Sequence, residues 1–328
     1  MSSGGSGALF RLTARLITER RDLDGGTVRW RMLLVGTSHG LHDVESGEAF
    51  VDGTEVTALA AGGPGRSYAL LDRRLVVLLD EAVGATVPAG ELPEHDGQSL
   101  AVLPDGTVVV GRTGARLAIV GLDGEIRDVK AFESVPGRDE WENPANPTPD
   151  TRTMAVGPTR WWVNVHVGGV WWSEDGGETW GGAVQPEADV HEVRSGTAGL
   201  VAVAAAVGFG WSEDDGESWS WTTDGLHGHY LRAVALDGDT AFVSASDGPF
   251  TRSGAVYRAR LGSGFVRCEV GLPERFDGNI DSGHLDAAGG RAALGFGDHV
   301  YVSEDSGQTW RVAAAFQEPV SAVRFMSA

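Results

Sequence analysis

The octapeptide SEDGGETW at residues 173–180 recurs as SEDDGESW at 212–219 and as SEDSGQTW at 303–310. An Asp side chain at the third position can accept hydrogen bonds from the amides of a tight turn, and Gly at the fifth tolerates positive φ. The Trp at the eighth position then begins the returning strand and packs into the core. The shared positions are Ser173, Asp175, Gly177 and Trp180; Ser212, Asp214, Gly216 and Trp219; and Ser303, Asp305, Gly307 and Trp310.

The spacing of the three copies points to a repeat architecture. They begin at residues 173, 212 and 303, which gives intervals of 39 and 91 residues. A period of about 40 residues is typical of one four-stranded blade of a propeller. The pattern resembles the Asp-box, or BNR repeat, of sialidases, sortilin-type receptors and photosystem II assembly factors. That resemblance implies a structural motif on the hairpin between the third and fourth strands of a blade.

The whole chain can be divided at the same period. With 48 Gly against 26 Lys plus Arg in 328 residues, it is rich in turn formers, and this favours many short strands. We expect one all-β domain over residues 1–328: a seven-bladed β-propeller of four-stranded antiparallel blades, closed by pairing the C-terminal strand with the N-terminal blade. The expected blades are 25–53 plus 319–328, 56–93, 98–135, 152–188, 190–226, 230–270 and 284–318.

Charge and composition restrict the partners. A formal net charge of −20 repels phosphate backbones, so we expect no nucleic-acid partner. No apolar run reaches the length that spans a bilayer, and the N-terminal stretch lacks a signal-peptide pattern. A single cysteine, Cys268, excludes an intrachain disulfide framework. We therefore expect a soluble, cytoplasmic protein without a membrane partner.

Eight of the nine histidines are expected on one face of this ring, with only His42 less clearly placed. In an up-and-down blade, the start of the first strand and the turn between the second and third strands lie at the same end. Neutral imidazoles that converge on a channel mouth suit a divalent metal ion, with Asp189, Asp281 or Asp298 as oxygen partners. The best candidates for metal ligands are His166, His191, His229 and His284. Solvated or structural histidines are the alternative.

A basic and aromatic set is expected near the same mouth. Arg112, Arg152 and Arg232 fall at strand ends on this face, together with Tyr230. Arginines around one opening can bind a carboxylate or phosphate through paired hydrogen bonds. Pairing with the many acidic side chains of this chain is the alternative. Two stretches that break the period, 136–151 and 271–283, are expected to be long surface loops.

Two functional hypotheses of different classes remain open. In the first, the mouth binds a metal ion, a small polar ligand, or both, for a lyase or hydrolase reaction. In the second, the same face binds another protein and the chain is a non-catalytic assembly scaffold. A sialidase-like glycoside hydrolase is disfavoured, because the chain has only four tyrosines and lacks the Arg-Ile-Pro motif of those enzymes. The sequence assigns no catalytic residue.

Overall fold

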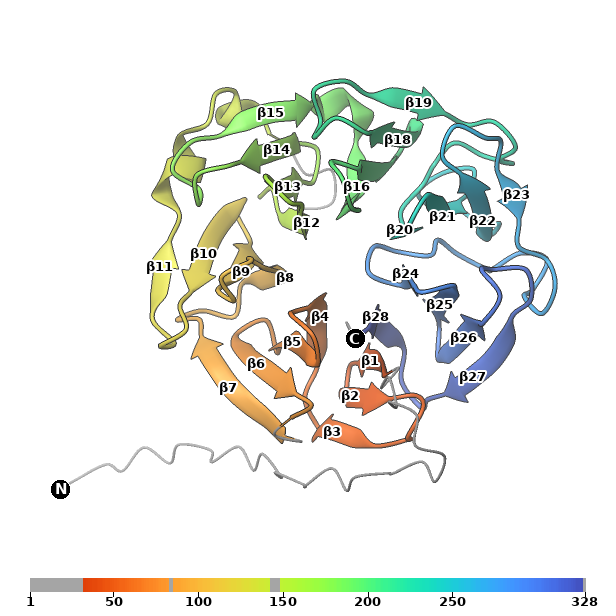
Figure 1. Cartoon of the computed structure of the whole chain (residues 1–328), viewed down its shortest axis with the longest axis horizontal. Helices are drawn as coiled ribbons and strands as arrows, with labels where there is room; N and C mark the ends of the chain where they lie inside the picture. Colours follow the sequence, from red (N-terminus) through yellow and green to blue (C-terminus); the bar gives the residue numbers. More distant parts are fainter. Residues whose placement is uncertain (1–31, 83–84, 142–147, 327–328) are drawn as a thin grey trace.

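The computed structural model describes residues 32–82, 85–141 and 148–326. Seven four-stranded antiparallel sheets stand like spokes around a central axis (Figure 1). Each sheet is one blade, and its strands run in order from the axis to the rim. The predicted seven-bladed β-propeller is therefore confirmed.

Blades 2 to 4 each take four consecutive strands, from the axis outward. Blade 2 contains β4 (Val56–Ala61), β5 (Arg66–Leu71), β6 (Leu75–Asp80) and β7 (Ala85–Glu91). Blade 3 contains β8 (Gly97–Val102), β9 (Val108–Arg112), β10 (Arg116–Val120) and β11 (Ile126–Asp128). Blade 4 contains β12 (Thr151–Val156), β13 (Trp161–Val165), β14 (Gly169–Ser173) and β15 (Gly181–Val184).

Blades 5 to 7 repeat this order. Blade 5 contains β16 (Val190–Ser195), β17 (Val201–Ala205), β18 (Gly208–Ser212) and β19 (Ser220–Thr222). Blade 6 contains β20 (Val234–Asp237), β21 (Thr240–Ala245), β22 (Ala255–Arg260) and β23 (Val266–Arg267). Blade 7 contains β24 (Leu285–Ala288), β25 (Arg291–Phe296), β26 (His299–Ser303) and β27 (Arg311–Ala315).

Blade 1 joins the two ends of the described chain. Its innermost strand is β28 (Val320–Phe325), followed outward by β1 (Leu33–Thr37), β2 (Gly40–Asp43) and β3 (Ala49–Asp52). β28 pairs antiparallel with β1, with Phe325 opposite Leu33. The predicted closure is confirmed, and it gives β28 a hydrogen-bonded neighbour within the same blade as the N-terminal strands.

The core lies between neighbouring blades rather than at the axis. Successive residues of a strand point to opposite faces of its sheet, so one strand contributes to two interfaces. In β13, Trp161 packs into the cluster shared with blade 3, and Trp162 packs into the cluster shared with blade 5. Both side chains are almost fully buried. Two consecutive tryptophans thus fill the interfaces on opposite sides of one blade.

Three short 3₁₀ helices complete the described structure: η1 (Lys130–Ser134), η2 (Arg138–Glu140) and η3 (Pro186–Ala188). Phe132 of η1 is buried, and its ring lies 4.5 Å from that of Trp180 and 5.9 Å from that of Trp141. Trp141, in the period-breaking stretch 136–151, is buried in the same cluster, so the described beginning of that stretch covers the core between blades 3 and 4. No helix in the described ranges is long and apolar enough to cross a membrane.

The three octapeptide turns share one hydrogen-bond pattern between the third and fourth strands of blades 4, 5 and 7. In the first copy, the Ser173 hydroxyl accepts from the Gly177 amide at 2.9 Å, and the Trp180 indole donates to the Gly177 carbonyl at 3.0 Å. Asp175 accepts from the Thr179 side chain and amide, which holds the pKa of Asp175 at about 2. The equivalent contacts recur in the other two copies.

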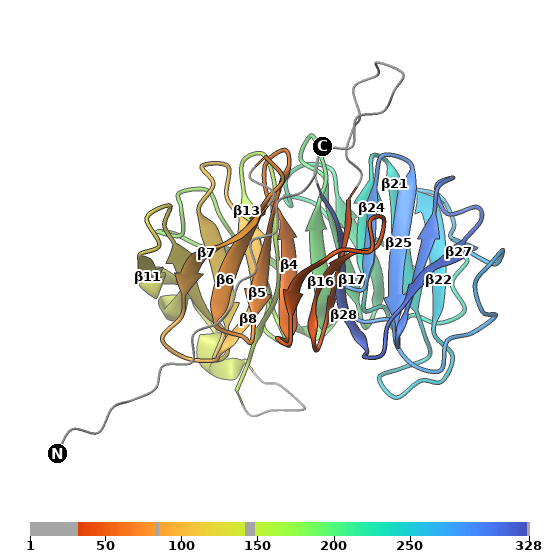
Figure 2. The same ribbon diagram turned by 90° about the horizontal axis from the view of Figure 1, so that it is seen from below.

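The strand order defines two faces of the ring, seen edge-on in Figure 2. We call the upper face the one where inner strands begin and where second strands turn into third strands, although this face lies at the bottom of the view in Figure 2. The lower face carries the hairpins between first and second strands and between third and fourth strands. The three octapeptide turns therefore lie on the lower face.

Candidate functional site

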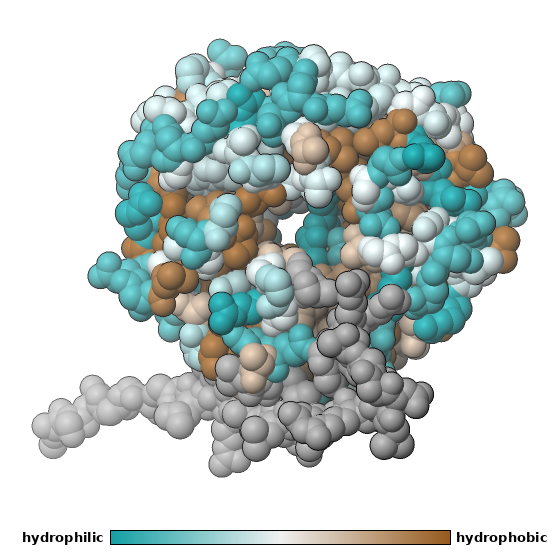
Figure 3. Space-filling view, in the orientation of Figure 1, coloured by the Kyte–Doolittle hydropathy of each residue, from teal (hydrophilic) through white to brown (hydrophobic). Residues whose placement is uncertain are grey.

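The seven inner strands surround a channel that is open in the space-filling view (Figure 3). Its upper mouth is formed by the beginnings of these strands and the segments that precede them. Its lower end is formed by the ends of the same strands and the hairpins that follow them. The two ends differ in which charged side chains they leave available.

The strand order places eight of the nine histidines on the upper face, as predicted. The exception is His42, which lies within β2 with its ring 5.1 Å from that of Phe316. The topology thus brings to one face side chains that the sequence distributes over six blades.

His166 and His191 approach each other at the upper mouth, with ring centres 6.4 Å apart. His191 is fully buried, and its Nδ1 lies 2.6 Å from the Leu231 carbonyl oxygen. Its Nε2 lies 3.4 Å from Asp189 Oδ2. Burial, followed by the charge of Arg152, lowers the pKa of His166 to about 4. His166 is therefore neutral at physiological pH.

The other two predicted ligands lie differently. His229 is exposed, with its Nδ1 2.7 Å from the Ala206 carbonyl oxygen. His284 immediately precedes β24, and burial lowers its pKa although the charge of Asp281 opposes the shift. Within residues 32–82, 85–141 and 148–326, no group of three or more His, Cys, Asp or Glu side chains is arranged to hold a metal ion. A metal at this mouth stays a prediction.

Arg152 and Arg232 converge on one carboxylate of their own chain. Arg152 Nη2 lies 3.3 Å and Arg232 Nη1 lies 2.6 Å from Asp281 Oδ1. The neighbouring Ser282 hydroxyl accepts from Arg152 Nε at 3.2 Å and lies 2.9 Å from the His191 carbonyl oxygen. The second period-breaking stretch, 271–283, thus reaches the mouth and is held there by blades 4, 5 and 6.

Tyr230 belongs to the same group. Its ring lies 4.7 Å from that of His191, and the Arg232 guanidinium carbon lies 5.6 Å from its centre. The structure therefore brings Tyr230, Arg152, Arg232 and His191 together around the end of segment 271–283. In this arrangement they bind that segment.

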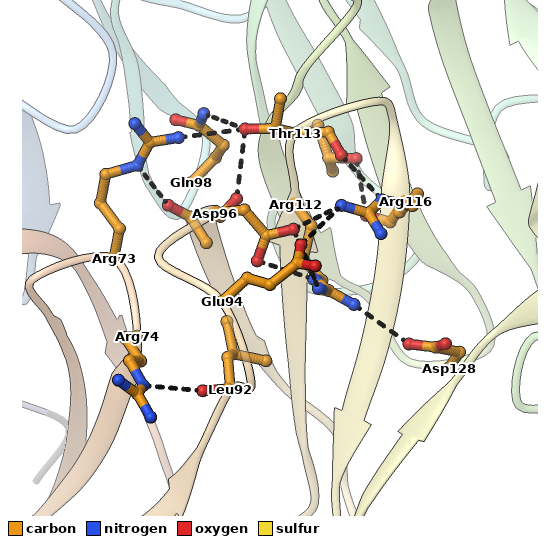
Figure 4. A network of polar contacts seen from close by, with 12 residues as sticks. Arg73, Arg74, Leu92, Glu94, Asp96, Gln98, Arg112, Thr113, Arg116 and Asp128 are labelled. Carbon is orange, nitrogen blue, oxygen red and sulfur yellow. Dashed lines mark hydrogen bonds and ion pairs between the residues drawn. The ribbon is translucent and has the colours of Figure 1, made fainter.

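Arg112, by contrast, is turned toward the rim of blade 3 (Figure 4). Its buried guanidinium donates to Asp96 at 2.9 Å and to Asp128, on the outermost strand β11, at 3.1 Å. Arg116 adds a second ion pair with Asp96 at 2.6 Å. The structure does not bring Arg112 to the mouth with the other predicted ligand-binding residues, because carboxylates of its own blade engage it.

A cavity opens at the lower end of the channel. We call it the lower pocket; its volume is about 620 Å³. The hairpins after the inner strands of blades 2, 3 and 4 form one side, and β16 and β28 contribute to the other. Its lining residues are 60–63, 66, 68, 100–106, 154–157, 194, 195 and 324.

The inner strands explain why the pocket forms there. In each, a bulky apolar residue is followed by a position that differs between blades. This position is Ala60, Ala101 and Ala155 in blades 2, 3 and 4, but Arg194 in blade 5 and Arg324 in blade 1. Small side chains therefore leave volume on one side of the channel, and two guanidinium groups stand on the other. All five residues line the pocket.

The counter-charge of Arg324 is the buried carboxylate of Asp286. Arg324 Nη1 donates to Asp286 Oδ1 at 2.9 Å, and Asp286 Oδ2 accepts from the Phe325 amide at 2.8 Å. Asp286 is buried and does not line the pocket. Burial, and then the like charge of Arg194, lower the pKa of Arg324.

Arg194 is held in the same way. Its Nη2 lies 2.8 Å from Glu192 Oε1, and its Nε donates to the Val234 carbonyl at 3.2 Å. Glu192 is fully buried, which raises its pKa, and it accepts the amides of Val234 and Gly283. Glu192 also lies outside the pocket lining.

Sequence reasoning missed Arg194 and Arg324, although a signal for them was present. Their strands read VHEVR at 190–194 and VSAVR at 320–324, so both arginines occupy the same position of an inner strand. Alignment of the seven inner strands with one another would have found them. The histidine pattern directed attention to the other face.

Comparison with known proteins shows the fold. No protein-family model matches the chain, and no curated protein does. Among solved structures, YCF48 bound to D1 peptide has a TM-score of 0.57 at 12% identity, covering 87% of this chain and 85% of that one. An ancestral GH74 enzyme has a TM-score of 0.57 at 14% identity, covering 92% of this chain but 40% of that one. The computationally designed Ika8 protein has a TM-score of 0.55 at 16% identity, covering 90% and 87%. At these identities, the likeness shows that the chain has a β-propeller fold.

Proposed function

We propose that this protein is a binding module that takes a segment of a partner protein at the lower pocket. The observation that carries the proposal is the pocket itself. Its volume of about 620 Å³ lies within the range of about 300–1,000 Å³ found for ligand sites. It combines apolar walls with three guanidinium groups, those of Arg66, Arg194 and Arg324, which is the composition of sites that bind a specific ligand.

The rim offers residue types that anchor protein contacts. Tyr68 and Arg66 line the pocket on the blade 2 side, with Met154 on the blade 4 side. Tyr and Arg are enriched among the residues that dominate binding energy at protein interfaces. The structural neighbour YCF48, which is bound to a peptide, gives the proposal a parallel within the same fold.

The upper mouth is the less favourable place for such a ligand. Arg152 and Arg232 already share Asp281, so a second carboxylate would have to displace an ion pair that the chain makes with itself. The cost of breaking that pair would be subtracted from the binding free energy. The lower pocket requires no such exchange.

A peptide selection tests the proposal. Random seven-residue peptides displayed on phage would be selected on the full chain, and an enriched peptide would be synthesised for calorimetry. Gly63→Trp should weaken binding at least tenfold, because Gly63 lines the pocket and a Cβ there would meet no atom within 4 Å. Val207→Trp, at an exposed turn of the upper face, is the matched control and should bind like the wild type. No enrichment, or equal affinity of the Gly63→Trp protein, would overturn the proposal.

A cation at the upper mouth is a second candidate, favoured by one contact. A carbonyl oxygen only accepts hydrogen bonds, so His191 Nδ1 must carry a proton to bind Leu231. In the neutral ring, Nε2 then presents a lone pair to Asp189 Oδ2, 3.4 Å away, and has no hydrogen-bond partner among the described atoms. A metal ion between the two groups would remove this conflict, and so would a second proton on the ring.

Zinc titration of protein purified without a polyhistidine tag separates these outcomes. If a metal binds there, Asp189→Asn should weaken binding at least tenfold. Asn is nearly isosteric and tolerates the positive φ of 47° at this position. His229→Asn, at an exposed histidine of the same face, is the control. Equal affinity of the wild type and Asp189→Asn would exclude this candidate.

A further inference from the structure

We propose that the lower pocket recognises a carboxylate attached to an apolar body, and that the Nε–Nη2 edge of Arg324 is the group that binds it. This deepens the proposed function, on which it rests for the location of the ligand. Such a site would distinguish a carboxylate from other anions and from neutral segments.

Arg324 has a hydrogen-bond donor without a partner among the residues that the structure describes. A guanidinium carries five N–H donors, and two of them, on Nε and Nη2, lie parallel along one edge. Arg324 uses Nη1 for Asp286, while its buried Nε has no hydrogen-bond partner among the residues that the structure describes. A buried donor without a partner is destabilising, so a ligand oxygen that reaches this edge supplies the missing hydrogen bond.

The two acids that balance the arginines, Asp286 and Glu192, are each held by backbone amides. Asp286 accepts the Phe325 amide as well as Arg324, and it is not among the residues that line the pocket. Glu192 is likewise held by the amides of Val234 and Gly283. An incoming carboxylate in the lower pocket would therefore meet the guanidinium groups, while neither acid is among the lining residues. Glu192 lines a smaller adjoining cavity of the channel together with Arg194 and Arg324.

Charge favours a carboxylate over a phosphate. Arg194 and Arg324 are already balanced by Glu192 and Asp286, and the chain carries a formal net charge of −20. A carboxylate adds one negative charge to this environment, while a phosphate monoester adds about 1.5–2. The planar Nε–Nη2 edge also matches the two oxygens of a carboxylate.

The walls define the rest of the ligand. Leu103, Val156 and Met154 line the pocket on the blade 3 and blade 4 sides, and Tyr68 lines it on the blade 2 side. Apolar and polar surface thus occur together around one basic edge. The C-terminal residue of a peptide, or a free organic acid, has this combination, and both present the same chemistry.

Matched probes separate these sources. Calorimetry on the full chain would compare 3-phenylpropanoate with its amide and with inorganic phosphate. It would also compare a blocked pentapeptide ending in Phe, as the free acid and as the C-terminal amide. We expect each acid to bind at least tenfold more tightly than its amide and than phosphate. Tighter binding of the peptide acid identifies a chain terminus, and tighter binding of phenylpropanoate identifies a small acid; either result supports the inference.

Conservative variants test the residue. Arg324→Lys keeps the charge beside Asp286 but removes the two-donor edge, so it should fold and bind the acids at least tenfold more weakly. Arg194→Lys should have a smaller effect, since Arg194 already uses Nε and Nη2. Arg260→Lys, at an exposed ion pair on β22, is the control. Circular dichroism would verify the fold of each variant.

The outcomes test the carboxylate inference and the protein-binding function separately. Equal binding of acid and amide, equal binding of phosphate, or wild-type affinity of Arg324→Lys would overturn the carboxylate inference. If both peptide forms bind equally and Gly63→Trp abolishes binding, the proposed function stands and only this inference fails. If phenylpropanoate binds through Arg324 and no peptide binds, this inference stands and the protein-binding function fails.

Discussion

The two ends of the channel use arginine in opposite ways. At the upper mouth, Arg152 and Arg232 point to Asp281, which segment 271–283 delivers to the channel. At the lower end, the buried Asp286 binds Arg324 and is also held by a backbone amide. What differs is the exposure of the counter-charge: the Asp281 side chain is 43% exposed, whereas Asp286 is buried.

The largest expected effect comes from removing the acid behind the lower pocket. Asp286→Ala leaves Arg324 buried without its carboxylate, and breaking a buried ion pair costs about 3–5 kcal/mol. Urea denaturation would measure the change in unfolding free energy. Asp239→Ala, which breaks the exposed pair with Arg260, should cost less than about 1 kcal/mol. Equal losses in the two variants would show that Asp286 has no special role.

The corresponding change at the upper mouth should be smaller and should not affect the lower pocket. Asp281→Ala removes the shared partner of Arg152 and Arg232, but Asp281 is 43% exposed, so we expect a loss of about 2 kcal/mol. The affinity for 3-phenylpropanoate should stay at the wild-type value. A loss of affinity in Asp281→Ala that matches Arg324→Lys would contradict the separation of the two ends.

A pH effect on stability is expected at the upper mouth. The pKa of His166 is about 4 in the folded protein, below its ordinary value of 6.5, so between these values the unfolded chain binds more protons. Stability is thus fully present above about pH 6.5 and is lost as pH falls toward 4. After discounting for partial exposure, we expect about 1–2 kcal/mol from this residue. Comparing urea denaturation of the wild type and His166→Gln at pH 7 and pH 4.5 would measure it; an equal pH dependence would contradict the assignment.

The fold was predictable because its signal is local and repeated. In each octapeptide turn, the hydrogen bonds that fix the turn form between residues of the same octapeptide, so eight residues of sequence are enough to predict its geometry. The spacing of Ser173, Ser212 and Ser303 then sets the strand order, and the strand order places the histidines on the upper face.

The availability of charged groups was not predictable in this way. Arg152 and Asp281 are 129 residues apart, and nothing near either residue indicates that they meet. Arg112 was correctly placed near a strand end, but Asp96 and Asp128 of its own blade turn it outward. The lower pocket was not predicted because it forms where the inner strands of blades 2, 3 and 4 carry alanine instead of a larger side chain. Small residues in a strand do not by themselves indicate a cavity.

β28 has a consequence for how the ring opens. The strand that supplies Arg324 is also the one whose pairing with β1 closes the propeller. Detachment of β28 would remove Arg324 from the pocket and break the circle at the same moment. Occupancy and closure are then thermodynamically linked: at a ligand concentration 100 times Kd, opening would cost about 2.7 kcal/mol more than in the free protein. Hydrogen exchange at the amides of β28 and β1 would therefore slow when the pocket is filled, so that the ligand determines the lifetime of the closed ring.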